Sequence, residues 1–154
     1  MPIKKLITLL KKYYPDVKCA LNYTTPEELL IATILSAQCT DKRVNIVTET
    51  LFKKYKVPQG LAKANLKELE QDIKSTGFYK NKAKNIKSCC EDLVKKHNSK
   101  VVPDLETLKD LAGVGRKTAN VVLGECFGVA EGIVVDTHVR RLSNRLGLPI
   151  SDNP

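Results

Sequence analysis

The run from Leu29 to Leu35 constrains the fold of this chain more than any other segment. It reads Leu-Leu-Ile-Ala-Thr-Ile-Leu and is apolar on nearly every face of a helix. Such a helix must be buried on all sides, which predicts a position at the centre of a helical bundle. Thr25, Pro26 and Glu28 precede it as N-cap, first helical residue and far end of a capping box. The predicted helix therefore begins at Pro26.

Helical periodicity dominates the rest of the chain, and turn signals separate the helices at short intervals. Only the segment from Ile133 to Val135 looks extended. We therefore predict an all-α fold of packed helices. Besides the central helix, the patterns predict helices near residues 3–13, 41–55, 65–73, 80–96, 104–111, 119–126 and 136–147.

The formal net charge is +9, from 26 Lys and Arg against 17 Asp and Glu. Such a surplus suits a polyanionic partner, but it also suits a plain basic surface, and charge alone does not decide between them. The five cysteines show neither disulfide-framework nor CxxC spacing, so we interpret them as reduced thiols in a cytoplasmic protein. No secretory signal is evident, and the longest apolar run is too short for a membrane span.

Residues 111–119 read Leu-Ala-Gly-Val-Gly-Arg-Lys-Thr-Ala and lie between two predicted helices. Two glycines two residues apart, Gly113 and Gly115, predict a tight backbone turn. The N–H groups of such a turn and the following helix dipole favour a phosphate, a contact that does not depend on base sequence. A plain helix–helix turn is the alternative, because Gly-x-Gly alone is a weak signal.

Two further residues raise the possibility of chemistry. Lys117 lies in the first turn of the second helix, where the positive end of the dipole disfavours a cation and so favours the nucleophilic neutral amine. Asp136 follows the apolar run that ends at Val135. It either caps the last helix or points into the cleft that Lys117 faces. Taken singly, each residue has a structural or surface role as its simpler interpretation.

Together these segments resemble the endonuclease III family of DNA glycosylase/AP lyases. The matching stretches are residues 111–122 at the hairpin, 135–139 around Asp136, 35–41 (Leu-Ser-Ala-Gln-Cys-Thr-Asp) and 76–83 (Thr-Gly-Phe-Tyr-Lys-Asn-Lys-Ala). They follow in the family's order over nearly the whole chain. The resemblance implies a six-helix-barrel type of helical bundle with a helix-hairpin-helix motif. It also implies base-excision repair, in which oxidised pyrimidines are removed and the strand is cut 3′ to the abasic site by β-elimination.

The same resemblance assigns roles to individual residues. Lys117 would attack C1′ of the damaged nucleotide, expel the base and form an imine. Asp136 would stabilise cationic sugar character and help transfer protons. Gln38 would fill the gap left by the flipped nucleotide and Phe78 would be the apolar wedge, with a loop amide and a core aromatic as equal alternatives. The predicted DNA-binding residues are Gly113, Val114, Gly115, Arg116, Thr118, Gln38 and Phe78.

The resemblance further implies three segments. Residues 1–20 would form the N-terminal helix of an incomplete cluster-side lobe, residues 21–132 the helix-hairpin-helix domain, and residues 133–154 the start of a return segment. Family members close with four cysteines that hold a [4Fe–4S] cluster, whereas no cysteines here have the C-x6-C-x2-C-x5-C spacing. We therefore expect no cofactor or metal in this chain, and a cluster only if the sequence continues beyond Pro154. Ala112 and Cys39 also depart from the family, which usually has Pro and often Ala there.

The expected partner is double-stranded DNA that carries a damaged base or an abasic site, bound by a monomer that acts in the cytoplasm at the nucleoid. Two alternatives stay open. A mismatch adenine glycosylase resembles this fold, but its hairpin generally lacks the lysine found here as Lys117. A non-catalytic helix-hairpin-helix module would bind DNA without forming a covalent bond to it. Borohydride trapping on abasic DNA separates these possibilities.

Overall fold

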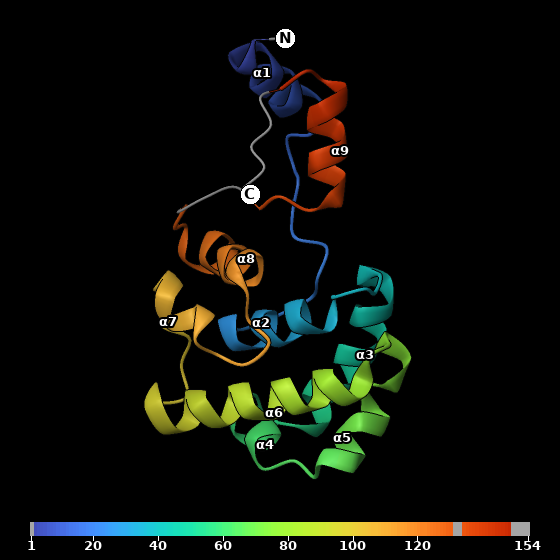
Figure 1. Ribbon diagram of the computed structural model, residues 1–154, viewed down its shortest axis with the longest axis vertical. Helices are drawn as coiled ribbons and strands as arrows, with labels where there is room; N and C mark the ends of the chain where they lie inside the picture. The colour runs from blue at the N-terminus through green and yellow to red at the C-terminus, as the bar shows by residue number, and fades with distance from the viewer. Residues whose placement is uncertain (1, 131–133, 149–154) are drawn as a thin grey trace. The chain divides into compact units, whose positions relative to one another are not determined.

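The computed structural model describes residues 2–130 and 134–148, and its ordered elements are all helices (Figure 1). No strand occurs among the described residues, so the prediction of an all-α fold is confirmed. The elements are α1 (Ile3–Tyr13), α2 (Pro26–Leu35), α3 (Asp41–Lys54), α4 (Gln59–Ala62), α5 (Leu66–Asp72), η1 (Lys74–Thr76), α6 (Tyr79–Lys96), α7 (Leu105–Lys109), α8 (Arg116–Phe127) and α9 (Thr137–Arg145).

The observed secondary structure differs from the predicted one at two places. The single turn α4 follows Pro58, in a segment where the sequence patterns predict no helix. Of the segment predicted to be extended, Ile133 lies outside the described residues, whereas Val134 and Val135 belong to neither a helix nor a strand. Short helices and isolated extended residues depend on surrounding contacts more than on local pattern, which is why periodicity resolves them poorly.

The chain divides into two compact units. One is formed by Met1–Cys19 with Ile133–Pro154 and contains α1 and α9. The other is formed by Ala20–Gly132 and contains α2 to α8 with η1. We refer to them as the terminal unit and the central unit.

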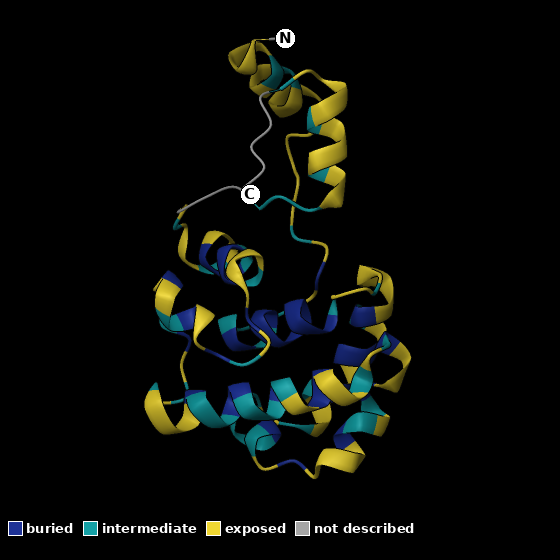
Figure 2. Ribbon diagram, viewed as in Figure 1, coloured by how far each residue is buried: buried dark blue, intermediate teal, exposed yellow. Residues whose placement is uncertain are grey.

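Helix α2 is the core of the central unit. Every residue from Leu29 to Leu35 is buried, and α2 packs against α3, α6 and α8 (Figure 2). Burial on all sides explains why this segment is apolar on all faces. The predicted position of α2 at the centre of the bundle is thus confirmed.

The N-terminus of α2 differs slightly from the predicted capping box. The Thr25 hydroxyl accepts a hydrogen bond from the Glu28 N–H at 3.2 Å, as expected of an N-cap. The Glu28 carboxylate, however, accepts from the N–H and hydroxyl of Thr24 at 2.8 and 2.7 Å, one residue before the expected partner. Asn65 and Asp104 cap α5 and α7 in the same way. Local capping therefore explains where these helices begin.

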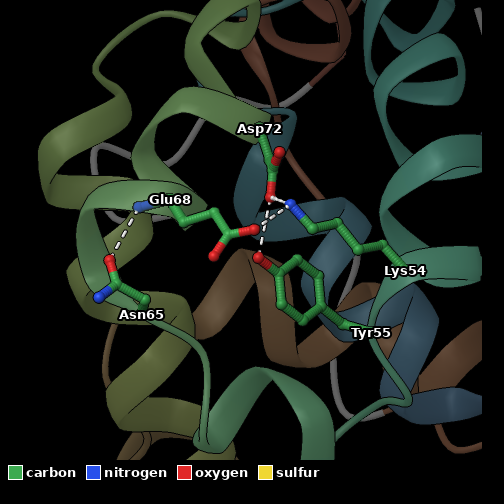
Figure 3. A network of polar contacts seen from close by, with 5 residues as sticks. All are labelled: Lys54, Tyr55, Asn65, Glu68 and Asp72. Carbon is green, nitrogen blue, oxygen red and sulfur yellow. Dashed lines mark hydrogen bonds and ion pairs between the residues drawn. The ribbon is translucent and has the colours of Figure 1, made fainter.

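A polar network joins the end of α3 to α5 (Figure 3). Lys54 Nζ lies 2.7 Å from Glu68 and 2.8 Å from Asp72, and the Tyr55 hydroxyl donates to Asp72 at 2.9 Å. The two carboxylates raise the pKa of Lys54, while burial together with the bond to Asp72 raises the pKa of Tyr55. At neutral pH the ammonium is charged and the phenol protonated, as is usual for lysine and tyrosine. The ion pairs and the hydrogen bond therefore hold the end of α3 against α5.

Helix α6 spans the central unit and contacts α2, α4, α5 and η1. One face of this helix forms part of the core, because Ala83, Ile86, Cys90 and Leu93 are buried. Val94, the neighbour of Leu93, is exposed. A charged residue, Lys82, is buried on the apolar face, at 5% exposure.

The terminal unit presents apolar side chains on its surface. Ile3, Ile7 and Leu10 on α1 are each about half exposed, as is Leu142 on α9. Both helices are amphipathic and neither contains a buried residue. Among residues 2–130 and 134–148, no helix has the length and apolar character that crossing a membrane requires.

Candidate active-site residues

The hairpin between α7 and α8 is a tight turn built around Gly113. The Val114 N–H donates to the Leu111 carbonyl at 3.2 Å and closes the turn. Gly113 has φ +76°, which is unfavourable for any residue with a side chain, and a Cβ there would lie 2.9 Å from Asn85 Cβ on α6. Both the backbone conformation and the contact with α6 therefore require glycine at position 113.

Gly115 differs from Gly113 and from what the sequence predicted for the pair. Its φ of −93° and ψ of −179° are extended values that any residue adopts, and a Cβ there meets no atom of the described chain within 4 Å. The turn therefore needs one glycine, not two. What Gly115 provides is open space at the N-terminus of α8.

The N-terminus of α8 lacks the side-chain cap that α2, α3, α5, α7 and α9 possess. Its N-cap residue is Gly115, and no described side chain accepts a hydrogen bond as a cap of its first turn. The first N–H groups of a helix have no partner within the helix and carry the positive end of its dipole. An anion that binds at this position would meet donors already oriented toward it.

The predicted hairpin residues divide into exposed and buried positions. Arg116 and Lys117 are exposed on the first turn of α8, and Thr118 is half-buried. Val114 is buried and its N–H is used inside the turn, so it anchors the hairpin from within. An exposed amine at a helix N-terminus has the access that a nucleophile needs.

Asp136 is the N-cap of α9 in the terminal unit. Its Oδ1 accepts hydrogen bonds from the N–H groups of His138 and Val139 at 2.9 and 2.8 Å. Its Oδ2 lies 3.7 Å from His138 Nδ1. The capping role considered for this aspartate is therefore present in the structure, and it fixes the orientation of the carboxylate. Lys117 belongs to the central unit.

Gln38 and Phe78 both occupy loops with an unusual backbone conformation. Gln38 has φ +54° and is exposed; Phe78 has φ +46° and is 70% exposed. Positive φ is uncommon for residues other than glycine and is strained for a bulky one. The alternative of a core aromatic is excluded for Phe78, because its side chain is mostly exposed at the start of α6.

The structure also reveals buried polar contacts that the sequence patterns do not indicate. The buried carboxylate of Glu27 accepts a hydrogen bond from the Val101 N–H at 2.8 Å. The buried ammonium of Lys82 donates to the carbonyls of Leu35 and Thr76 at 2.9 and 2.8 Å. In the sequence, Lys82 falls at helical spacing with Ile86, Cys89 and Leu93. This position on an apolar face is the one sequence feature that indicates a buried lysine.

Two of the five cysteines, Cys89 and Cys90, are poorly suited to hold an iron–sulfur cluster. Burial raises the pKa of Cys89 to about 12, and that of Cys90 is raised mainly by burial as well. Since the thiolate is the metal-binding form, these two thiols are poor ligands. Across the described residues, no three His, Cys, Asp or Glu side chains gather as a metal site requires.

Comparison with known proteins places these features in a family. Residues 31–154 match the HhH-GPD superfamily of base excision DNA repair proteins. The chain is 51% identical to endonuclease III from Synechocystis over 97% of its own length and 68% of that protein. It is 51% identical to the Bacillus subtilis endonuclease III, over 88% of this chain and 61% of the relative. The chain thus spans about two thirds of the length of these bacterial relatives.

Solved structures agree with the sequence relatives. A non-covalent endonuclease III–DNA complex matches 99% of this chain and 71% of its own, with a TM-score of 0.92 and 50% identity. A trapped covalent endonuclease III–DNA intermediate matches equally well. A thermostable thymine-DNA glycosylase, 24% identical with a TM-score of 0.83, shares the fold. These matches agree with the hairpin, in which an exposed lysine lies at the N-terminus of α8. The chain therefore belongs to the endonuclease III family of the HhH-GPD superfamily of base excision DNA repair proteins.

Proposed function

We propose that the protein is a bifunctional DNA N-glycosylase and AP lyase that removes oxidised pyrimidines and then cuts the strand. The observation that carries this proposal is the exposed Lys117 amine on the first turn of α8, beside an N-terminus that no described side chain caps. The partner is double-stranded DNA with a damaged base or an abasic site, bound by a monomer. Because that substrate is chromosomal DNA, the protein acts in the cytoplasm at the nucleoid.

The hairpin holds a DNA phosphate next to the amine. The N–H groups at the start of α8 donate to the phosphate, and Gly115 leaves space for a close approach. Arg116 is exposed on the same turn and adds charge attraction, while Thr118 offers a hydroxyl donor. Gly113 and the buried Val114 hold the turn in shape. This contact fixes the register of the protein on the strand without reading a base.

Lys117 supplies the covalent step. Its neutral amine attacks C1′, the glycosidic bond breaks, and the base leaves with the bonding electrons and takes up a proton. Opening of the sugar gives an iminium between the lysine and C1′. Loss of a C2′ proton then expels the 3′ phosphate by β-elimination, and water hydrolyses the imine to release the lysine. The Asp136 carboxylate stabilises cationic sugar character and accepts protons in these steps.

The nucleotide must leave the base stack to reach the amine. Phe78 presents an exposed aromatic ring on a strained loop, which suits an apolar wedge that unstacks the duplex. Gln38 presents an exposed amide from a second strained loop and fills the gap that the nucleotide leaves. Both residues have a strained backbone conformation with positive φ. Strained residues of this kind cluster at functional sites, which supports a role in DNA binding for both loops.

Borohydride trapping on one abasic duplex tests the proposal in the complete protein. Lys117→Ala is expected to abolish strand cleavage and covalent trapping and to leave most of the DNA affinity, because the hairpin backbone is unchanged. Lys117→Arg is expected to be equally inactive, since a guanidinium stays protonated and forms no imine. Trapping by Lys117→Ala at the wild-type level would contradict the assignment of the nucleophile.

Asp136→Asn is the matched variant for the carboxylate. Asparagine caps helices about as well as aspartate, so the fold of α9 is retained and only the charge is lost. Near-normal DNA binding with slow turnover is the expected result. A wild-type protein that binds abasic DNA without being trapped would instead indicate a non-catalytic DNA-binding module.

A further inference from the structure

Lys82 is a buried cation in the central unit, on the face of α6 that packs against α2 and η1. None of the ion pairs within the described part of the chain includes it. Burial lowers the pKa of Lys82, and the nearby Cys39 partly offsets that effect. Burying a charge without an opposite charge is costly, so this ammonium is stabilised by the hydrogen bonds that it donates.

The two hydrogen bonds of Lys82 go to the last residues of two helices. Its Nζ donates to the carbonyl of Leu35, the last residue of α2, and to that of Thr76, the last residue of η1. The last carbonyls of a helix lack partners within the helix, and a cation at that end is favourable. One ammonium therefore holds the ends of two separate elements.

Each of these carbonyls lies two or three residues before a proposed DNA-probing residue. Gln38 is three residues after Leu35, and Phe78 is two residues after Thr76. Both probing residues have positive φ. Between Thr76 and Phe78, Gly77 has φ +75° and ψ +160°, a conformation essentially restricted to glycine. The loops therefore leave their helices at points that the Lys82 ammonium holds together.

Lys87 on the same helix offers a direct comparison. Its Nζ also donates to two backbone carbonyls, those of Ala62 and Ala64 at 2.8 and 3.0 Å, near the end of α4. It is half-buried and lies 3.5 Å from the Glu91 carboxylate. The same kind of contact thus occurs at a position that leads to neither proposed DNA-probing loop.

We propose that Lys82 is a positioning residue that holds the Gln38 and Phe78 loops in one arrangement, so that both act together when the damaged nucleotide is extruded. This inference rests on the proposed function. An apolar side chain would pack on α6 without the cost of burying a charge, but it would leave the two carbonyls without a donor and the loops free to separate.

The test compares Lys82→Met with Lys87→Met in the complete protein. 2-Aminopurine next to the damaged pyrimidine reports extrusion by its rise in fluorescence, and single-turnover cleavage is measured on the same duplex. Lys82→Met is expected to lose most of the fluorescence rise and at least about tenfold in rate, because both charged hydrogen bonds of Lys82 are lost. Lys87→Met is expected to match wild type in both measurements.

A second substrate separates positioning from general damage. When the same nucleotide lies in an unpaired bulge, extrusion costs little, so Lys82→Met should cleave it at nearly the wild-type rate. Lys82→Arg keeps a cation that can donate to both carbonyls and should restore most of the fluorescence rise. If Lys82→Met does not fold, Lys82→Gln, which keeps a donor but is too short to reach both carbonyls, serves in its place.

The outcomes distinguish the two proposals. Equal losses on paired and bulged substrates, or equal losses in the Lys82 and Lys87 variants, would overturn the role of Lys82 and leave the proposed function intact. A wild-type protein that neither traps with borohydride nor raises the fluorescence would overturn the proposed function, and this inference with it.

Discussion

The two hairpin glycines meet different demands, although they look equivalent in the sequence. Gly113 has a positive φ and lies against Asn85, whereas Gly115 is extended and faces open space. The fold therefore explains one glycine. The proposed phosphate contact accounts for the other, since it brings a ligand close to the backbone at Gly115.

This difference gives a prediction at the scale of single residues. Gly113→Ala is expected to lower the free energy of unfolding by about 1–3 kcal/mol, because the new Cβ is strained and meets Asn85. Gly115→Ala is expected to change stability by less than about 0.5 kcal/mol but to weaken DNA binding about tenfold, since the methyl group occupies the phosphate approach. Urea unfolding and fluorescence anisotropy measure the two effects. Equal behaviour of both variants in both measurements would refute the distinction.

At the scale of elements, α2 decides whether the central unit forms. It is buried along its length and contacts α3, α6 and α8. Removing side-chain volume from its middle leaves a cavity that the surrounding helices fill only partly. The stability of the unit should therefore depend on α2 more than on any surface helix.

Leu30→Ala or Ile34→Ala in α2 is expected to reduce the free energy of unfolding by about 2–5 kcal/mol. Ile46→Ala on α3 is the matched control, because Ile46 is 51% exposed and its loss should cost about 0.5 kcal/mol. Denaturant unfolding of the three variants gives the comparison. Losses in α2 no larger than that of the control would mean that the helix is not the core.

At the scale of the whole molecule, we expect the net charge of +9 and the proposed hairpin contact to attract DNA together. Each phosphate neutralised by a cation contributes about −0.9 to the slope of log affinity against log salt. We expect a slope of about −3 or steeper on undamaged duplex, measured by anisotropy between about 50 and 200 mM salt. Arg116→Gln is expected to make the slope shallower by about 1. A flat salt dependence would contradict the nucleic-acid interface.

The sequence by itself determined the features that depend on near neighbours. Thr25, Asn65 and Asp104 cap their helices because an N-cap bond spans only three residues. The burial of α2 followed from apolar side chains on all its faces, and the position of Lys117 followed from its distance to the hairpin glycines. These signals are local, so no tertiary contact was needed to interpret them.

Only the tertiary structure decided which residues meet across the chain. Lys82 reaches the Leu35 carbonyl 47 residues away, and Glu27 accepts the Val101 N–H 74 residues away. It also revealed that Phe78 is exposed and that Gly115 is extended. A lysine in a helical pattern looks like a solvated charge until the chain returns and places two carbonyls beside it. The role of Lys82 depends on these tertiary contacts. Helical periodicity indicates which face of the helix a residue occupies, but not which part of the chain packs against that face.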